Sequence, residues 1–379
     1  MNKFLSIATA FAVSALLFSC CGSDKGDGPQ PEPKVDPVPE VSFAKGADIG
    51  WVSEMEKAGM KFTDSKGNTE IFSVLKGLGM NSVRLRVWVA PPDAAGWSGK
   101  DDVVAMAKRA AAAGLAVMID FHYSDFFADP SHQDIPASWS GKTAMDFTDK
   151  VSSHTTEVLK ALKDAGVSPQ WIQIGNETRN GMLWPAGQLW TSSGDIPGGW
   201  NNFDALYMSG YNAAKAVFPD AYVMPHLNHA YEDNEWWFTK LKAAGGKFDM
   251  IALSHYPMSE GTGGWSSVNS SAIANIKNLS AKFGVKVLVA EFGVRQKDSQ
   301  AGQCSSAFID AVKALGPGVC SGIFYWEPEV DGTWKPAVYS KTVKKHGKNE
   351  EWNAYDMGAF TRSGSTFSPN PAILSAFSQ

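Results

Sequence analysis

From Phe43 onward, short apolar runs alternate with longer amphipathic segments along the chain. The short runs are rich in β-branched and aromatic residues, as buried strands are, whereas the longer segments space their apolar residues three or four apart, as helices do. Gly114, Gly166 and Gly284 follow three of the amphipathic segments, where helix C-caps are expected. The expected strands are 44–51, 80–88, 115–122, 171–177, 221–227, 249–256, 286–292 and 321–327, and the expected helices include 101–113, 144–165, 203–217, 234–244, 267–283 and 305–315.

Strands that alternate with helices favour a parallel sheet built from βα units. The length of 379 residues allows two domains or one large one, but eight βα units are the number in a (β/α)8 TIM barrel. The alternative is a doubly wound open sheet, which would carry a glycine-rich phosphate-binding turn after its first strand. Residues 44–54 contain no such G-x-G-x-x-G pattern. We therefore predict a single catalytic α/β domain, a (β/α)8 TIM barrel over residues 43–379.

The first 42 residues have the composition of an N-terminal targeting signal followed by a tether. Lys3 and the apolar stretch that follows it predict a signal peptide over residues 1–19, too short to span a bilayer. The sequence LFSC ending at Cys20 resembles a lipobox, so Cys20 is the expected lipid anchor, with ordinary cleavage and free secretion as the alternative. Residues 20–42 are rich in proline and predict an extended tether. The expected location is lipid-anchored at the outer membrane, on the cell surface, and otherwise secreted or periplasmic.

Charge and cysteine content exclude several classes of partner. Lys and Arg total 34 and Asp and Glu total 39, so the net charge of −5 provides no electrostatic footprint for nucleic acid or an anionic membrane surface. Cys304 and Cys320 are the cysteines of the domain itself, and the helix expected between them would hold them too far apart for a disulfide. Two free thiols are expected, and no Cys/His spacing predicts a zinc site.

Polar residues gather at the carboxyl ends of the expected strands. In a barrel these ends meet at one face, which is where barrel enzymes build their active sites. The amino ends of the same strands show no such gathering of functional side chains, as at Leu115 and Ser321. Six strands contribute polar or aromatic ends: Arg84 and Arg86, then Asp120, His122 and Asp125, then Asn176 and Glu177, then His255 and Tyr256, then Glu291, and finally Trp326 and Glu327.

Glu177 and Glu291 each end an apolar strand, where an unpaired charge is costly. For either one alone, a buried ion pair is a sufficient explanation. These two end the fourth and seventh strands, which face each other across a narrow barrel, so their carboxylates are expected to converge. Converging carboxylates serve glycoside hydrolysis, in which one protonates the leaving oxygen and the other attacks the anomeric carbon or activates water.

Arg84 and Arg86 flank Leu85, so alternation along the strand directs both arginine side chains into the barrel. An interior arginine needs an acidic partner, and either arginine could hold Glu291 in its ionised form. Structural ion pairing alone is the alternative. A charged Glu291 would in turn keep Glu177 protonated near neutral pH, because neighbouring like charges disfavour ionisation.

The chain has 14 tryptophans, more than a core requires. Indole rings are flat apolar surfaces that suit the C–H faces of pyranose rings, and a row of them suits a polysaccharide. For each tryptophan, burial in the core is the alternative, and it is the expectation for Trp171 at the start of a strand. Those expected in or beside the loops at the barrel mouth are Trp88, Trp97, Trp184, Trp200, Trp326 and Trp334.

Together these residues resemble glycoside hydrolase family 53, the endo-β-1,4-galactanases, a family of barrel glycosidases with carboxylates on strands four and seven. The resemblance extends from about Ala44 to the C-terminus, and its most specific part is the ordered combination of DFHYSDFFADP, GNE and FYWEP. The matching stretches are 46–51 (GADIGW), 54–56 (EME), 81–88 (NSVRLRVW), 120–126 with 129–130, 173–177 (QIGNE), 253–257 (LSHYP) and 322–328 (GIFYWEP).

The resemblance implies a retaining endo-β-1,4-galactanase that hydrolyses galactan side chains of pectin by double displacement. Glu177 would be the acid/base and Glu291 the nucleophile. It also implies that Asn176 binds the sugar 2-hydroxyl, that Arg84 and Tyr256 orient Glu291, and that Trp326 forms the floor of the −1 subsite. The complete set of expected substrate-binding residues is Asn176, Arg84, Arg86, His122, Asp125, His255, Tyr256, Trp326, Trp88 and Trp97.

No cofactor or metal is expected. The segment 295–300 (RQKDSQ), where some bacterial relatives carry a calcium loop, has one carboxylate, whereas calcium takes six to eight oxygens. The expected partner is the neutral β-1,4-galactan polysaccharide, with no nucleic acid, contact with the membrane only through the N-terminal lipid, and a monomeric state. The alternatives are another endo-glycosidase of the same clan, such as a β-mannanase or xylanase, and a surface glycan-binding lipoprotein.

Overall fold

The computed structural model of the chain describes residues 41–336, 343–345, 348–350 and 356–378. The predicted signal peptide, the Cys20 anchor and most of the predicted tether lie outside the described residues. Within the described ranges, no helix is long and apolar enough to cross a membrane. The described residues therefore belong almost entirely to the predicted catalytic domain.

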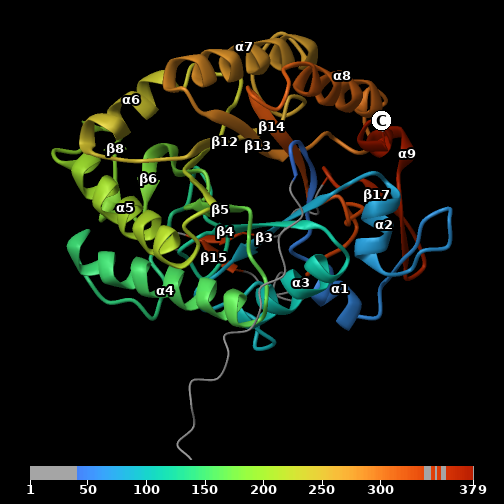
Figure 1. Cartoon of the computed structure of the whole chain (residues 1–379), viewed down its shortest axis with the longest axis horizontal. Helices are drawn as coiled ribbons and strands as arrows, with labels where there is room; N and C mark the ends of the chain where they lie inside the picture. The colour runs from blue at the N-terminus through green and yellow to red at the C-terminus, as the bar shows by residue number, and fades with distance from the viewer. Residues whose placement is uncertain (1–40, 337–342, 346–347, 351–355, 379) are drawn as a thin grey trace, which may run out of the picture. The chain divides into compact units, whose positions relative to one another are not determined.

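The central sheet is parallel, with the strand order β10-β5-β4-β3-β1-β14-β13-β12-β11. Its two outer members are halves of one chain segment interrupted at Pro225, and β10 pairs with β5 while β11 pairs with β12. The sheet therefore closes on itself as an eight-stranded barrel, which confirms the predicted (β/α)8 fold (Figure 1). The strands are β1 (Ala44–Asp48), β3 (Ser82–Val87), β4 (Ala116–Phe121), β5 (Trp171–Ile174), β10 (Tyr222–Met224), β11 (His226–Leu227), β12 (Met250–His255), β13 (Lys286–Phe292) and β14 (Cys320–Trp326).

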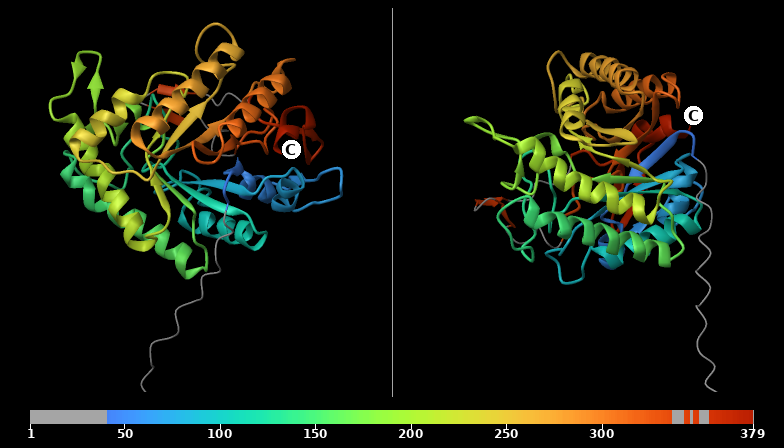
Figure 2. Two further views of the ribbon diagram at one scale, coloured as in Figure 1. Left: turned by 45° about the horizontal axis from the view of Figure 1, so that its top comes forward. Right: turned by 60° about the vertical axis from the view of Figure 1, so that its left-hand side comes forward.

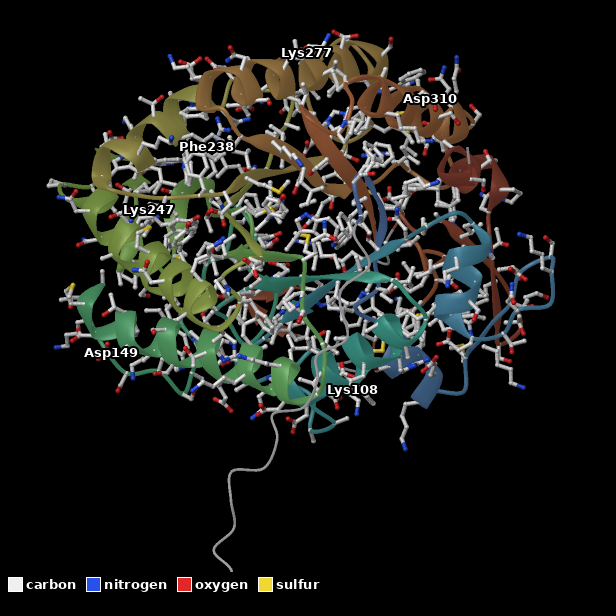
Figure 3. The ribbon with its side chains drawn as sticks, viewed as in Figure 1. Lys108, Asp149, Phe238, Lys247, Lys277 and Asp310 are labelled. Carbon is white, nitrogen blue, oxygen red and sulfur yellow. The ribbon has the colours of Figure 1, made fainter. Side chains whose placement is uncertain are left out.

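Helices form a ring around these strands, as Figure 1 shows. The helices α3 to α8 each have a buried apolar side, and charged residues such as Lys108, Asp149, Lys277 and Asp310 lie on the outer, exposed side (Figure 3). The described helices are α1 (Val52–Lys57), α2 (Ile71–Gly77), α3 (Lys100–Ala112), α4 (Met145–Asp164), α5 (Gly199–Val217), α6 (Glu235–Ala244), α7 (Trp265–Phe283), α8 (Ala301–Ala314) and α9 (Pro371–Leu374).

The helix that precedes β14 begins earlier than the sequence pattern predicts. α8 starts at Ala301 rather than residue 305, so Cys304 lies within the helix and faces the core. Cys304 and Cys320 are both buried and free, as predicted. Burial raises the pKa of the Cys304 thiol to about 12, which makes it unreactive.

Short elements extend the loops around the barrel. β2 (Lys61–Phe62), β17 (Phe360–Ser363) and β18 (Thr366–Pro369) form a small side sheet in which β18 is central. The long loop after β5 contains two hairpins, and the β8–β9 hairpin projects from the body of the ring in both views of Figure 2. The remaining short elements are η1 (Thr178–Asn180), β6 (Gly181–Met182), β7 (Gly187–Gln188), β8 (Trp190–Thr191), β9 (Gly194–Asp195), β15 (Val343–Lys345), β16 (Lys348–Glu350) and η3 (Ser375–Ser378).

Apolar side chains fill the lower part of the barrel interior. Trp171 is 1% exposed and its ring packs edge-on against Phe324, so Trp171 is a core residue, as predicted. Gly46 is required beside them, because a Cβ at this position would lie 2.2 Å from the Phe324 ring. These side chains belong to an apolar cluster inside the barrel, which leaves the carboxyl ends of the strands as the place for polar chemistry.

Candidate active site

Glu177 lies three residues after the end of β5. Its backbone has a left-handed conformation, with φ 47° and ψ 49°. This conformation is uncommon for a residue with a side chain and indicates local strain. Its backbone N–H donates a 3.3 Å hydrogen bond to Nδ1 of His226, and η1 begins at the next residue. The Glu177 side chain is held at the barrel mouth and is 9% exposed.

Glu291 reaches the mouth because β13 contains an irregularity. Ala252 and Leu253 on β12 pair with Leu288 and Val289, but the next residue, Ser254, pairs with Glu291. Ala290 is therefore an extra residue, and strict alternation would have directed Glu291 outward. The irregularity keeps both Ala290 and Glu291 on the inner face of the barrel.

Arg84 is the centre of the buried charge network. Its Nη2 lies 2.8 Å from Oε1 of Glu291 and 2.9 Å from Oδ2 of Asp120, and its Nη1 is paired with Asp48. Arg84 is 1% exposed, and although burial opposes its charge, the three carboxylates raise its pKa above the ordinary value. The sequence left open which of the two arginines pairs with Glu291. In the structure, that partner is Arg84.

Two donors hold the Glu291 carboxylate. Arg84 contacts Oε1, and the hydroxyl of Tyr256 donates a 2.6 Å hydrogen bond to Oε2. Burial raises the pKa of Glu291 above its ordinary value, and Asp48 and Asp120 act in the same direction, whereas Arg84 and Tyr256 lower it. Both oxygens are fixed in position, which is how a nucleophilic carboxylate is oriented.

Glu177 has acidic neighbours instead. Burial raises its pKa well above the ordinary value, and the charge of Glu291 raises it further. Glu260 and Asp129 act in the same direction, whereas a hydrogen bond from Ser254 opposes them. Two carboxyl groups at one mouth, one held by a cation and the other surrounded by acids, are suited to act as a base or nucleophile and as a general acid.

Asn176 is positioned from both sides of its amide. Its Oδ1 accepts a 2.8 Å hydrogen bond from Nη2 of Arg84, and its Nδ2 donates to the carbonyl oxygen of Ala128 at 2.8 Å. Gln133 further donates to the carbonyl oxygen of Asn176 at 2.8 Å. The predicted neighbours Arg84, Asn176 and Glu177 are therefore in one network.

His226, Gln173 and Ser254 belong to this network, but sequence reasoning did not identify them. Gln173 lies between Arg84 and His226, accepting from Arg84 Nη2 at 3.0 Å and approaching His226 Nδ1 at 2.9 Å. Ser254 Oγ lies 2.9 Å from His226 Nε2. The strand-end rule could have found His226, because it is the penultimate residue of the expected fifth strand, 221–227, which ends where β11 ends.

Arg86 has a different partner from Arg84. It is paired with Glu327, which also accepts a 2.8 Å hydrogen bond from Nε1 of Trp51. The guanidinium carbon lies 4.2 Å from the centre of the Trp51 ring and 4.9 Å from that of Trp88. Arg86 is fully enclosed with these groups. Contrary to the prediction, its side chain is therefore not placed to bind substrate.

Trp88 requires the same correction. Its side chain is 2% exposed, and its ring packs against Phe126 at 4.8 Å and Phe127 at 5.3 Å. It supports Arg86 from within the core instead of offering a free face. Trp97, which is half-buried, borders a small crevice beside Trp88.

His122 faces the site with a defined tautomer. Its Nδ1 accepts from the backbone N–H of Ala128 at 2.9 Å, so Nε2 carries the proton and lies 2.9 Å from Asp120. Asp125 instead organises loops, because its two oxygens accept from the backbone N–H groups of Ala90 and Ala137 at 3.0 and 2.8 Å. Both lie in the segment after β4.

His255 is on the outer face of β12, away from the carboxylates. It is completely buried, its Nε2 lies 2.8 Å from Asn269 on α7, and its ring lies 4.1 Å from that of Phe308 on α8. Burial lowers its pKa to about 4. The prediction placed it with Tyr256 at the mouth, but adjacent residues of a strand face opposite sides, and Tyr256 has the inner side.

Trp326 is a partly exposed indole next to Tyr256. Its ring meets that of Tyr256 edge-on, with centroids 6.0 Å apart. Trp334, by contrast, is 7% exposed and belongs to the core. No group of three or more His, Cys, Asp or Glu side chains in the described parts of the chain is arranged to hold a metal ion.

A parallel eight-stranded barrel with two carboxyl groups at the carboxyl ends of β5 and β13 is the arrangement of a barrel glycosidase. Comparison with known proteins gives the family. The family model described as glycosyl hydrolase family 53 matches residues 44–306. The chain belongs to this family and is a glycoside hydrolase, which confirms the resemblance inferred from its motifs.

Relatives and solved structures agree with this assignment. An arabinogalactan endo-beta-1,4-galactanase of Thermothelomyces thermophilus is 32% identical over 307 residues, covering 75% of this chain and 89% of that protein. The family 53 catalytic domain of Ignisphaera aggregans has a TM-score of 0.72 and 27% identity, covering 91% of this chain and 99% of that one. A fungal beta-1,4-galactanase has a TM-score of 0.70 and 28% identity, covering 88% and 98%.

Proposed function

We propose that the protein is a retaining endo-β-1,4-galactanase that hydrolyses the galactan side chains of pectin. The observation that carries this proposal is the contrast between the two carboxyl groups: Arg84 and Tyr256 hold Glu291, while acidic neighbours surround Glu177. The substrate follows from the family 53 relatives, which include endo-β-1,4-galactanases of Thermothelomyces thermophilus and Bacillus subtilis.

In the first half-reaction, Glu291 forms a bond to the anomeric carbon as Glu177 gives its proton to the departing glycosidic oxygen. In the second, the Glu177 carboxylate takes a proton from water, whose oxygen replaces Glu291 on the anomeric carbon. Tyr256 and Arg84 orient Glu291 throughout. Trp326 provides an apolar face for the sugar at the −1 subsite.

The substrate is tested by incubating the protein with linear β-1,4-galactan, β-mannan and xylan and separating the products over time. Long oligosaccharides from galactan at early times are expected and would establish endo action. Galactose alone would contradict endo action, and release from mannan or xylan without release from galactan would reject the substrate. Retention is tested by NMR, which should detect the β-anomer as the first product.

The catalytic roles are tested with Glu177→Gln and Glu291→Gln. Each should reduce turnover by about a thousandfold or more while leaving oligosaccharide binding in place, because shape is kept and the ionisable group is lost. The matched control is Glu157→Gln, at an exposed position on α4 with 62% of its side chain accessible. Full activity of either site variant would reject the assignment, and the glycan-binding alternative predicts binding without turnover in the unmodified protein.

The location and assembly are proposed from the sequence alone. We propose cleavage before Cys20, lipid attachment at Cys20, and a tether over residues 20–42 that connects the anchor to a monomeric barrel. Metabolic labelling with a fatty acid should mark the natural protein but not a Cys20→Ala variant. Equal labelling of both would reject the anchor.

A further inference from the structure

Ser254 is a completely buried hydroxyl on the inner face of β12. Its Oγ lies 2.9 Å from Nε2 of His226, and hydrogen bonding by its side chain lowers the pKa of the Glu177 carboxyl group. Ser254 also pairs in register with Glu291 on the neighbouring strand. A single hydroxyl thus connects a histidine of β11 to one of the two reacting carboxyl groups.

The direction of these hydrogen bonds follows from the other nitrogen of His226. The backbone N–H of Glu177 donates to Nδ1 at 3.3 Å, and the amide nitrogen of Gln173 lies 2.9 Å from the same atom. Because two donors point at Nδ1, it is an acceptor and the ring proton is on Nε2. Nε2 then donates to Ser254 Oγ, so the hydroxyl proton of Ser254 is available to Glu177.

Two further features support donation from Nε2 of His226 to Oγ of Ser254. Oδ1 of Asn176 lies 3.0 Å from Nδ1 of His226, but it already accepts a 2.8 Å hydrogen bond from Arg84 and needs no proton from the imidazole. Burial lowers the pKa of His226 well below its ordinary value, and the charge of Arg84 lowers it further. Asp120 opposes that effect and His122 adds to it. The imidazole therefore remains neutral while the carboxyl groups titrate.

We propose that Ser254, oriented by His226, is a positioning residue that donates a hydrogen bond to Glu177 and stabilises its ionised form. This inference rests on the proposed role of Glu177 as acid/base. Glu177 must be protonated in the first half-reaction and ionised in the second, and a hydroxyl donor bonds more strongly to the carboxylate than to the neutral acid. Ser254 thus favours the second half-reaction.

The surroundings of Glu177 explain why such a donor is needed. Glu291 from β13, Glu260 from the loop after β12 and Asp129 from the loop after β4 all disfavour its ionisation. The Tyr256 hydroxyl, also nearby, donates to Glu291, and its pKa is raised by burial and then by the charges of Glu291 and Glu177. Without the donor, Glu177 would keep its proton too firmly to act as a base on water.

The test is Ser254→Ala, measured with two kinds of substrate. The alkaline limb of kcat/KM on a galacto-oligosaccharide should move up by about one pH unit, because the acid form of Glu177 persists to higher pH. With an activated aryl galacto-oligosaccharide, whose leaving group needs no proton, the second half-reaction limits kcat. There the acid limb should also move up by about one unit, and kcat below that limb should fall about tenfold.

Controls separate this effect from a change of packing. Ser254→Thr keeps the hydroxyl and should retain both limbs of the original enzyme. Ser305→Ala removes an equally buried hydroxyl on α8, which donates to the Ile373 carbonyl, and should shift neither limb. If Ser254→Ala does not fold, Ser254→Cys, a similar volume with a weaker donor, must show smaller shifts in the same direction.

Unchanged limbs in a folded Ser254→Ala or Ser254→Cys enzyme would overturn the inference. Such a result would leave the proposed function intact, provided that Glu177→Gln remains inactive. Full activity of Glu177→Gln would instead remove the proposed function itself, so the two failures are distinguishable.

Discussion

The hydroxyl of Tyr256 donates a 2.6 Å hydrogen bond to Oε2 of Glu291. Tyr256 directly follows β12 and Glu291 lies on the neighbouring strand β13, and their contact exists because β13 carries one extra residue that keeps Glu291 on the inner face. Arg84 holds the other oxygen, so the carboxylate is clamped between a neutral donor and a cation.

Tyr256→Phe should make the nucleophile easier to protonate. The donated hydrogen bond lowers the pKa of Glu291, so its loss raises that pKa and moves the acid limb of kcat/KM to higher pH by about one unit. Tyr211→Phe is the control, because Tyr211 hydrogen bonds to Asp249, on another part of the barrel. A Tyr256→Phe enzyme with an unshifted acid limb would contradict the orienting role.

Gly50→Ala should displace Arg86. A Cβ at Gly50 would lie 2.1 Å from Nη1 and 2.4 Å from the guanidinium carbon of Arg86, which is locked between Glu327 and the Trp51 ring. We expect a loss of about 1–3 kcal/mol in the free energy of unfolding, measured by urea denaturation. Gly318→Ala meets no atom within 4 Å and should be neutral; equal stability of the two variants would show that the Arg86 cluster can relax.

Glu329→Gln should change how stability depends on pH. Burial raises the pKa of Glu329 well above its ordinary value, and Glu327 and Asp48 raise it further, while the backbone N–H groups of Trp51 and Glu329 itself oppose the rise. A carboxyl group with a raised folded-state pKa contributes stability that is complete below the unfolded pKa and is lost as pH rises toward the folded value.

The glutamine variant lacks this loss. Its free energy of unfolding, relative to the original protein, should therefore increase between pH 5 and pH 7 at up to about 1.4 kcal/mol per pH unit. Urea denaturation at several pH values measures the difference. Asp310→Asn, at an exposed site on α8, is the control and should show little change (Figure 3). A constant difference between Glu329→Gln and the original protein would mean that Glu329 is ionised in the folded state.

His255→Gln should affect stability and not catalysis. The imidazole packs on Phe308 and contacts Asn269 between the barrel and its helices, so its replacement should cost about 1–3 kcal/mol. KM and kcat on galactan should be unchanged at a temperature where the variant is folded. His122→Gln, which alters the contact with Asp120 beside Arg84, should reduce kcat/KM in the same assay. A raised KM in His255→Gln would contradict this expectation and support the original prediction that His255 contacts substrate.

The sequence by itself determined the barrel and its chemistry. Periodicity marked eight strands and their helices, because a buried parallel strand must be apolar along its length while a covering helix needs an apolar stripe. Glu177 and Glu291 were identifiable because each interrupts that apolar pattern at a strand end. Free thiols at Cys304 and Cys320 also followed from helix geometry, and the family followed from motifs.

Only the tertiary structure decided which polar groups meet. Alternation placed Arg84 and Arg86 on the same face but did not distinguish their partners, which depend on which strand ends lie opposite. His255 and Trp88 carry the side chains of a binding site, yet one faces the helices and the other is enclosed around Arg86. Glu291 points inward through an extra residue that no periodicity predicts, because a bulge is a property of two paired strands.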